Sequence, residues 1–305
     1  MSHKYYKLDK LDLDILHSLL DNCRESDRQI GNNIGISGAA VNSRISKMIK
    51  NKTIEDYTIK IEPSVFGYNL LYIVVTGQDT DEILRDIELV GEPFLIVPVI
   101  GGITVCGIVV KENVQQKIEI AKKLMRDAKI ITIFEAENPG IRSDLTRTDV
   151  DIITELLKNP RSKIDELAKN TKLSTKTIGR SLQKIQNDEA IQFTLIFDPK
   201  KFGPYIPFVV MTWINGNFNE TLKLLKKEFE KSFLMKPFLS KNQIVLFLYS
   251  NNIFELDSVT QNIRKVKGVG SADLFIPKKI IFQQKWVNSA IKDAKTSQRL
   301  HLAYN

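Results

Sequence analysis

The sequence IGISGAAVNSRISKMIKNKTI, residues 34–54, has the pattern of a tight turn followed by a capped helix. Ser37 stands just before the helical run, where a serine oxygen accepts from the unpaired N–H groups of a first turn. Apolar residues then recur at i, i+4 and i+7, which predicts one buried stripe: Val41, Ile45 and Met48. This pattern is typical of the second helix of a helix-turn-helix. Its opening Gly-Ala-Ala, however, carries almost nothing that hydrogen-bonds to a base.

The same pattern returns 137 residues later as KLSTKTIGRSLQKIQNDEAI, residues 172–191. The register of 137 holds from residue 14 to residue 54, as three pairs illustrate: Asp14/Asp151, Arg24/Arg161 and Ser37/Ser174. One residue is then dropped, after which Gly67 aligns with Gly203. A shared register of this length indicates an internal duplication.

Each copy begins with three short helical patterns, followed by a segment in which polar and apolar residues partly alternate. These segments are TIEDYTIKIEP (53–63) and AIQFTLIFDP (190–199), and each is expected to form a small β-hairpin. Three helices and a hairpin make a winged helix-turn-helix.

The rest of each copy predicts the order β-α-β-β-α-β, which is ferredoxin-like. In the first copy we expect strands at 70–76, 94–100, 103–110 and 130–136, and helices at 80–90 and 114–128. In the second copy we expect strands at 206–214, 233–240, 243–250 and near 272–282, and helices at 219–231 and 253–265.

The expected fold class is therefore α+β, built from two copies of a winged helix-turn-helix followed by a ferredoxin-like domain. The expected bounds are 1–63 and 141–199 for the winged helices, and 64–140 and 200–305 for the ferredoxin-like domains, the last with a C-terminal tail. Residues 138–147 contain Pro and Gly without periodicity and are expected to link the copies.

The net charge of +8 is distributed unevenly along the chain. Residues 1–63 and 145–199 each carry a net charge of +1, whereas residues 64–144 carry −4 and residues 200–305 carry +10. The basic pI therefore comes from the last domain and is a poor argument for DNA binding. Opposite charges favour pairing between the two ferredoxin-like domains, and we hypothesise an intramolecular pseudo-dimer that is able to assemble further into a homodimer or higher assembly.

The motifs LDKLDLDIL (8–16) and LTRTDVDII (145–153), the turns with capped helices, and the strand entries FGYNLLYIVV and FGPYIPFVV resemble the Lrp/AsnC transcription factors. The resemblance covers nearly the whole chain twice, and it implies that the ferredoxin-like domain mediates dimerisation and often amino-acid sensing. The Gly-x-x-Asp pattern of the family's sensing members is replaced here by Gly101-Gly102-Ile103-Thr104 and Ser240-Lys241-Asn242-Gln243. We therefore assign no residues to a small-molecule effector.

Double-stranded DNA is the expected partner, and the outward faces of the two capped helices supply the candidate contacts. These are Ser37, Ala39, Ala40, Asn42, Ser43, Arg44, Lys47 and Lys50 in the first copy, and Ser174, Thr175, Lys176, Thr177, Arg180 and Lys184 in the second. Methyl groups and Asn42 favour A·T pairs, whereas Lys176 and Arg180 suit guanine acceptors. We therefore expect weak, A·T-leaning readout by the first helix and stronger, more G-tolerant readout by the second.

Two other functions are compatible with the same fold. Siroheme decarboxylases have similar two-domain protomers and rely on histidines in the second domain, but between Lys4 and Leu300 this chain has only His17. A protein that keeps the fold for protein interactions alone is the other alternative.

No apolar run is long enough for a membrane span, and two distant cysteines fit a reducing cytoplasm. We expect a non-enzymatic protein and assign no catalytic residue, cofactor or metal ligand.

Overall fold

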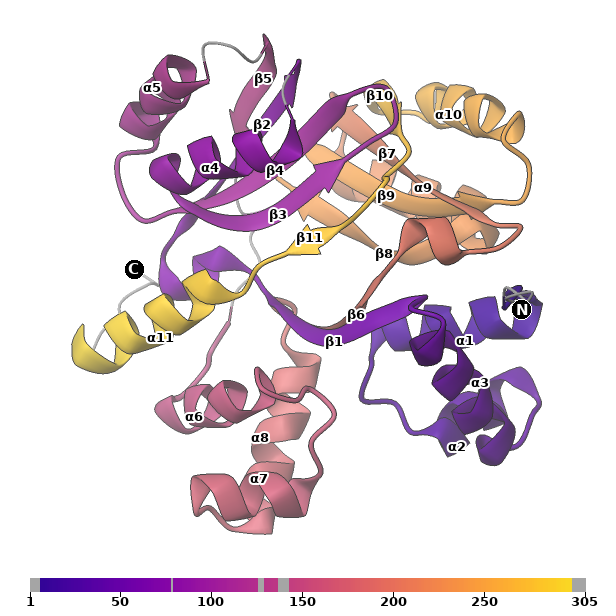
Figure 1. The fold of residues 1–305 in the computed structure, drawn as a ribbon, viewed down its shortest axis with the longest axis vertical. Helices are drawn as coiled ribbons and strands as arrows, with labels where there is room; N and C mark the ends of the chain where they lie inside the picture. The colour runs from indigo at the N-terminus through magenta and orange to yellow at the C-terminus, as the bar shows by residue number, and fades with distance from the viewer. Residues whose placement is uncertain (1–5, 78, 126–128, 137–142, 298–305) are drawn as a thin grey trace, which may run out of the picture.

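A computed structural model describes residues 6–77, 79–125, 129–136 and 143–297 of the 305-residue chain. The mixture of helices and sheets confirms the α+β class and the repeated order of elements. Figure 1 shows two sheets in the upper part of the molecule and two groups of three helices below them, joined through a two-stranded ribbon. Part of the expected linker, residues 138–142, lies outside the described residues.

Three helices form at the start of each copy, as the sequence predicts. They are α1 (Lys10–Asp21), α2 (Asp27–Ile34) and α3 (Gly38–Lys50), and α6 (Arg147–Leu156), α7 (Ile164–Thr171) and α8 (Thr175–Asn187). Both first helices begin with a capping box, in which Asp9 and Asp12, or Thr146 and Asp149, satisfy each other's backbone N–H groups. Gly35 ends α2 with φ of +78°, a left-handed conformation that glycine adopts without strain.

The prediction of a hairpin after each third helix is wrong. Each segment forms a single strand, β1 (Ile54–Ile61) or β6 (Ile191–Phe197), and the two strands pair with each other in antiparallel orientation. Neither segment contains a Gly, Asn or Pro within the strand to reverse the chain, so each strand takes its partner from the other copy. Thr58 lies opposite Thr194, its equivalent in the duplication, so the centre of the ribbon is a local two-fold axis.

Each copy continues into a ferredoxin-like domain. The first contains β2 (Asn69–Thr76), α4 (Thr80–Val90), β3 (Glu92–Pro98), β4 (Ile103–Val110), α5 (Val114–Leu124) and β5 (Lys129–Glu135), and the second contains β7 (Ile206–Ile214), α9 (Phe218–Phe229), β8 (Phe233–Ser240), β9 (Gln243–Ser250), α10 (Glu255–Lys265) and β10 (Val269–Phe275). The strand orders, β5-β2-β4-β3 and β10-β7-β9-β8, are equivalent. Short 3-10 turns connect the elements: η1 (Pro63–Phe66), η2 (Pro199–Lys201) and η3 (Glu230–Ser232).

The C-terminal segment differs from the single strand expected near 272–282. Strand β10 ends at Phe275, and the chain then crosses to the first copy, where β11 (Ile281–Phe282) pairs with β3. Pro277 lacks an N–H group and interrupts the strand, while the uncovered edge of β3 offers unpaired backbone groups to the chain that follows. A helix that the sequence reasoning missed, α11 (Lys285–Ser297), then packs against η1, β3 and α6.

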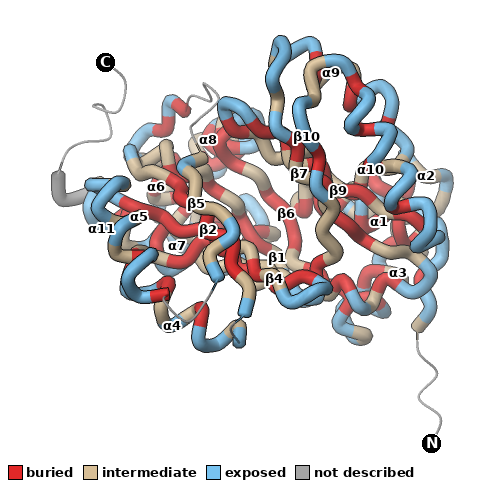
Figure 2. The backbone as a smooth tube through the Cα atoms, turned by 90° about the horizontal axis from the view of Figure 1, so that it is seen from above, coloured by how far each residue is buried: buried red, intermediate tan, exposed pale blue. Residues whose placement is uncertain are grey.

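The two ferredoxin-like sheets present their helix-free faces to each other. On the opposite faces, α4 and α5 cover the first sheet through Ile83, Ile87 and Ala121, and α9 and α10 cover the second through Leu225 and Ile263. Figure 2 shows that buried positions concentrate on the central strands, while the outer surfaces of the helices are exposed. Trp286 of α11 is 1% exposed and lies edge-on to Phe66 and Phe94, so it is a packing residue of the core.

Candidate nucleic-acid interface

The two capped helices, α3 and α8, have the predicted orientation. The Oγ atom of Ser37 accepts from the N–H of Ala40 at 3.2 Å, and that of Ser174 accepts from Thr177 at 3.1 Å. Both helices bury the predicted stripe in the core of their own three-helix unit: Val41, Ile45 and Met48 in α3, and Ile178, Leu182 and Ile185 in α8. The faces predicted to contact DNA therefore point away from the core.

Most of the candidate contact residues are exposed. They are Ser37, Ala39, Asn42, Ser43, Lys47 and Lys50 in the first copy, and Ser174, Thr175, Lys176 and Arg180 in the second. Ala40, Arg44, Thr177 and Lys184 are half-buried. Figure 1 places both three-helix units on the same side of the β1–β6 ribbon, away from the two larger sheets. Both capped helices therefore lie on one side of the ribbon.

Arg44 is held by two carboxylates beneath α3. Its Nη1 atom donates to Asp12 Oδ1 at 2.8 Å and to Asp9 Oδ2 at 2.9 Å. Asp12 is 1% exposed, so its carboxylate depends on these bonds. The hydrogen bond with Asp12 raises the pKa of Arg44, and bonds from the Asp12 N–H and Arg44 outweigh burial to lower the pKa of Asp9. Arg44 thus stabilises the start of α1.

The second copy holds the equivalent carboxylate, Asp149, with different residues. Ser181, which replaces Arg44, donates its hydroxyl to Asp149 Oδ1, and Lys184 donates to Oδ2 at 3.1 Å. Lys184 also donates to the backbone carbonyl of Asp144 at 2.6 Å. Burial raises the pKa of Asp149, but hydrogen bonds from Ser181, Thr146 and Lys184 outweigh it and lower that pKa overall.

This exchange changes which cations face outward. Lys184 is engaged with Asp149, whereas its equivalent in the first copy, Lys47, is exposed and forms no ion pair within the described part of the chain. The exposed cations of α3 are consequently Lys47 and Lys50, in its second half. Those of α8 are Lys176 and Arg180, in its first half.

Asn42 also has a partner in this structure. Its Nδ2 atom donates to Asp27 Oδ2 at 2.8 Å, and Asp27 Oδ1 accepts from Arg161 of the second copy at 3.3 Å. Bidentate recognition of adenine uses both the amide nitrogen and the amide oxygen, so it requires Asn42 to release Asp27.

Reciprocal contacts of two arginines, Arg24 and Arg161, join the two copies. Neither arginine was predicted from the sequence to have a functional role. Arg24 Nη2 donates to the carbonyl of Ser162 at 2.9 Å, and its guanidinium lies 5.5 Å from the ring centroid of Phe193. Arg161 lies 5.0 Å from the ring centroid of Tyr57 and donates to its hydroxyl at 3.3 Å. Because Arg24 and Arg161 are equivalent in the duplication, their repetition was the available signal.

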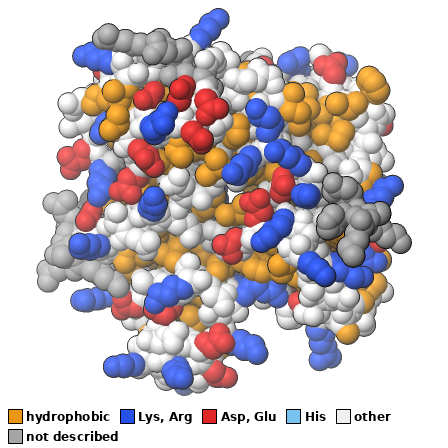
Figure 3. Space-filling view, viewed as in Figure 1, with side chains coloured by type: hydrophobic (Ala, Val, Ile, Leu, Met, Phe, Trp, Pro, Cys, Tyr) orange, Lys and Arg blue, Asp and Glu red, His pale blue; other side chains and the backbone are white. Residues whose placement is uncertain are grey.

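The face shown in Figure 3 carries basic and acidic side chains of both signs, interspersed over the surface. This agrees with the near-neutral charge of both winged helices. Any contact with phosphates therefore depends on a few individual lysine and arginine side chains.

Within the described residues, no group of three or more His, Cys, Asp or Glu side chains is arranged to hold a metal ion. None of the described helices is long and apolar enough to cross a bilayer.

Comparison with known proteins gives two domain matches in this chain. A family model for an AsnC-type helix-turn-helix domain matches residues 8–49, and one for a winged helix-turn-helix DNA-binding domain matches residues 145–192. The HTH-type transcriptional regulator LrpA of Pyrococcus horikoshii is 34% identical over 96 residues, which cover 29% of this chain and 67% of that protein. LrpA of Pyrococcus abyssi is 37% identical over 95 residues, covering 28% of this chain and 64% of that protein.

Among solved structures, the siroheme decarboxylase NirDL is similar over 95% of this chain and 100% of its own, with a TM-score of 0.49 and 9% sequence identity. The AsnC protein of E. coli covers 46% of this chain and 94% of its own, with a TM-score of 0.31 and 20% identity.

Proposed function

The chain belongs to the Lrp/AsnC family of DNA-binding transcriptional regulators, and we propose that it reads an asymmetric site on double-stranded DNA with two unequal winged helices. The observation that carries this proposal is the arrangement of α3 and α8. Both are capped, both bury one stripe, and both lie on the same side of the ribbon. Recognition helices read bases with their N-terminal residues and fix their register through phosphate contacts.

The two helices are proposed to divide these tasks. Lys176 and Arg180 lie in the first half of α8, where a bidentate arginine discriminates guanine by about 1–3 kcal/mol. The first half of α3 offers Ala39 and Ser43 to the groove, and Lys47 and Lys50 follow at phosphate-contacting positions. We therefore propose base readout mainly by α8 and a larger share of backbone contact by α3.

We further propose that the two copies act as an intramolecular pseudo-dimer. Three features support this: the β1–β6 ribbon centred on equivalent threonines, the reciprocal contacts of Arg24 and Arg161, and the crossing of β11 and α11 to the first copy. Each joins residues of the first copy to residues of the second. Light scattering at micromolar protein should give the 34.8 kDa mass of one chain as the smallest stable species. Larger species in which the first copy of one chain pairs with the first copy of another would contradict the intramolecular pairing.

Selection of bound fragments from genomic DNA tests the reading of an asymmetric site. We expect an asymmetric consensus, with G·C preference confined to one half and A·T preference to the other. Arg180→Ala should reduce the difference in binding free energy between specific and scrambled DNA by about 1–3 kcal/mol. Lys169 is an exposed lysine of α7, and Lys169→Ala should leave this difference unchanged. A symmetric consensus, or an unchanged difference in Arg180→Ala, refutes the proposed division.

We propose that the protein has no enzymatic activity and that it is located in the cytoplasm, together with the DNA. The alternative of a protein that has lost DNA binding is decided by salt dependence, because phosphate neutralisation makes log Kd depend linearly on log salt concentration. Absence of salt-dependent binding to any genomic fragment would favour that alternative.

A further inference from the structure

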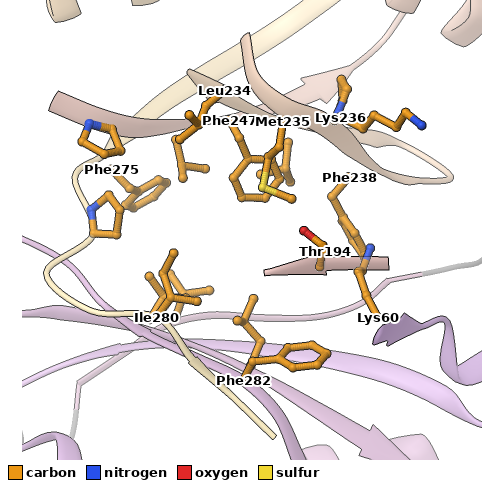
Figure 4. A pocket seen from close by; sticks show the side chains of 18 of the residues that line it. Lys60, Thr194, Leu234, Met235, Lys236, Phe238, Phe247, Phe275, Ile280 and Phe282 are labelled. Atoms are coloured by element: carbon orange, nitrogen blue, oxygen red, sulfur yellow. The ribbon is translucent and has the colours of Figure 1, made fainter. Parts of the chain in front are cut away.

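A cavity of about 200 Å³ lies between the helix-free faces of the two ferredoxin-like sheets. Val97 and Val105 line it from the first copy, and Val209, Val245 and Phe247 line it from the second. The β1–β6 ribbon closes one side through Thr58 and Thr194. In Figure 4, Phe238, Phe247 and Met235 of the second sheet face Ile280 and Phe282 of the crossing segment.

The size and composition of this cavity suit a single aromatic ring. An apolar cavity of about 150 Å³ lined by aliphatic and aromatic side chains holds benzene, so this volume accommodates about eight or nine non-hydrogen atoms. Aromatic rings gather at one end, where Tyr72 stacks on Phe134 with centroids 5.4 Å apart and lies edge-on to Phe238 at 6.1 Å. An aromatic ligand gains both area burial and ring-edge contacts from such a wall.

One buried amide nitrogen in the lining has no hydrogen-bond partner among the described residues. Gln243 begins β9 and is 3% exposed, and its Nε2 atom has no hydrogen-bond acceptor among the described residues. Its neighbours in register are Ser240 on β8 and Trp213 on β7. A buried amide donor without an acceptor is unfavourable, so an oxygen atom that reaches Gln243 from the cavity satisfies it.

Several other polar groups of the lining already have partners. Gln192 Nε2 and Thr194 Oγ1 both donate to the carbonyl of Leu20, at 3.0 and 2.8 Å. The two lysines of the lining are each paired with a carboxylate: Lys60 with Glu62 at 2.8 Å, and Lys236 with Asp21 at 2.7 Å. No cation in the lining is left to neutralise an anionic ligand, so an uncharged ligand fits the site.

We propose that this cavity binds a small, uncharged, single-ring aromatic compound with one oxygen acceptor, which accepts a hydrogen bond from Gln243 Nε2. The site lies inside the chain, between its two copies, and against the ribbon that carries both winged helices. Binding itself does not depend on the proposed function, because it rests only on the cavity and on Gln243.

A pair of isosteric probes tests the proposal with the full-length protein. Acetophenone carries a carbonyl oxygen where α-methylstyrene carries a methylene group, and ligand-detected NMR titration gives both dissociation constants. We expect saturable binding of both, with acetophenone about 2- to 12-fold tighter, the range that one net hydrogen bond gives. Benzoate, which is similar in size but charged, should bind at least tenfold more weakly than acetophenone.

Two variants locate the site and the donor. Gln243→Leu should bring the affinity ratio of acetophenone to α-methylstyrene close to one. Gln192→Leu is the matched control, because its amide already donates to Leu20, and it should keep the wild-type ratio. Val245→Phe fills the cavity and should weaken both probes at least tenfold, and its unfolding temperature and circular dichroism establish that it folds.

The outcomes separate this proposal from the proposed function. Absence of saturable binding, tighter binding of benzoate, or unchanged binding in Val245→Phe overturns the site. Equal affinity of both uncharged probes for the wild type overturns the role of Gln243 and shows that water or nothing satisfies its amide. Retained acetophenone binding in a protein that binds no DNA overturns the proposed function and leaves the site standing.

Discussion

Replacing Arg24 with alanine removes a bridge between the winged helices of the two copies. The guanidinium donates to the carbonyls of Pro160 and Ser162, both buried, and lies 5.5 Å from the ring centroid of Phe193. Hydrogen bonds from charged donors contribute about 1.5–3 kcal/mol each, and a partly exposed cation–π contact about 0.5–1 kcal/mol. Burial lowers the pKa of Arg24, which shows that desolvation of the guanidinium offsets part of this gain. We therefore expect Arg24→Ala to reduce the free energy of unfolding by about 3 kcal/mol.

Urea unfolding, followed by circular dichroism and by tryptophan fluorescence, measures this loss. The two signals must be fitted separately, because a chain with several domains need not unfold in one step. Arg28→Ala is the matched control, since Arg28 is exposed on α2 and surface substitutions usually change stability by less than about 0.5 kcal/mol. If Arg24→Ala unfolds within that margin of Arg28→Ala, the contact does not hold the copies together and the reasoning is refuted.

Three further predictions concern the two three-helix units and the crossing helix. Because hydrogen bonds lower the pKa of Asp149, its stabilising contribution is present above the ordinary carboxyl pKa and is lost as pH falls through the lowered value. Ser181→Ala removes one of these bonds and should raise the midpoint of acid unfolding, as followed by circular dichroism below about pH 4. Lys47→Ala should reduce the salt slope of DNA binding by about 1, whereas Lys184→Ala should change it less because Lys184 is paired with Asp149; equal slopes would contradict this. Trp286→Ala should lower stability by about 3–5 kcal/mol in urea unfolding, since the side chain is 1% exposed.

The local features of the fold were predictable because they depend on local spacing. The serine caps of α3 and α8 and their buried stripes follow from three or four residues each, and the structure confirms them. The strands of both ferredoxin-like domains are apolar runs bounded by turns, and all of them except β10 lie close to the expected residues. Because the sequence repeats at a separation of 137 residues, the elements expected in the second copy could be checked against those expected in the first.

The pairing between copies was not predictable from local pattern. Alternation in residues 54–61 shows that a strand forms but not which strand it pairs with, so a hairpin was expected where β1 pairs with β6. Likewise, nothing in the sequence around Ile281 shows that two residues would cross to the edge of β3. Strand partners are chosen by tertiary contacts that bring distant segments together.

The candidate DNA-contacting residues illustrate a second limit of sequence reasoning. Helical periodicity places Arg44 and Lys184 towards the outward faces, but it gives no information about the carboxylates beneath them. Asp12 and Asp149 recur at equivalent positions because each caps its own first helix, and each has a partner on the third helix of the same unit. The cations of α3 and α8 are therefore divided between those that hold a carboxylate and those that are exposed, and only the packed structure reveals this division.

That division explains why a fused pair of copies gains something that two identical protomers cannot. In the first copy a single arginine holds the buried carboxylate, which leaves Lys47 exposed in the second half of α3. In the second copy a serine shares that task with Lys184, so the exposed cations of α8 lie in its first half. In a symmetric homodimer both helices would hold the carboxylate in the same way, either with an arginine or with a serine and a lysine. Covalent fusion lets the two helices differ, so the lysine that holds a carboxylate in the second copy, Lys184, has an exposed equivalent, Lys47, in the first.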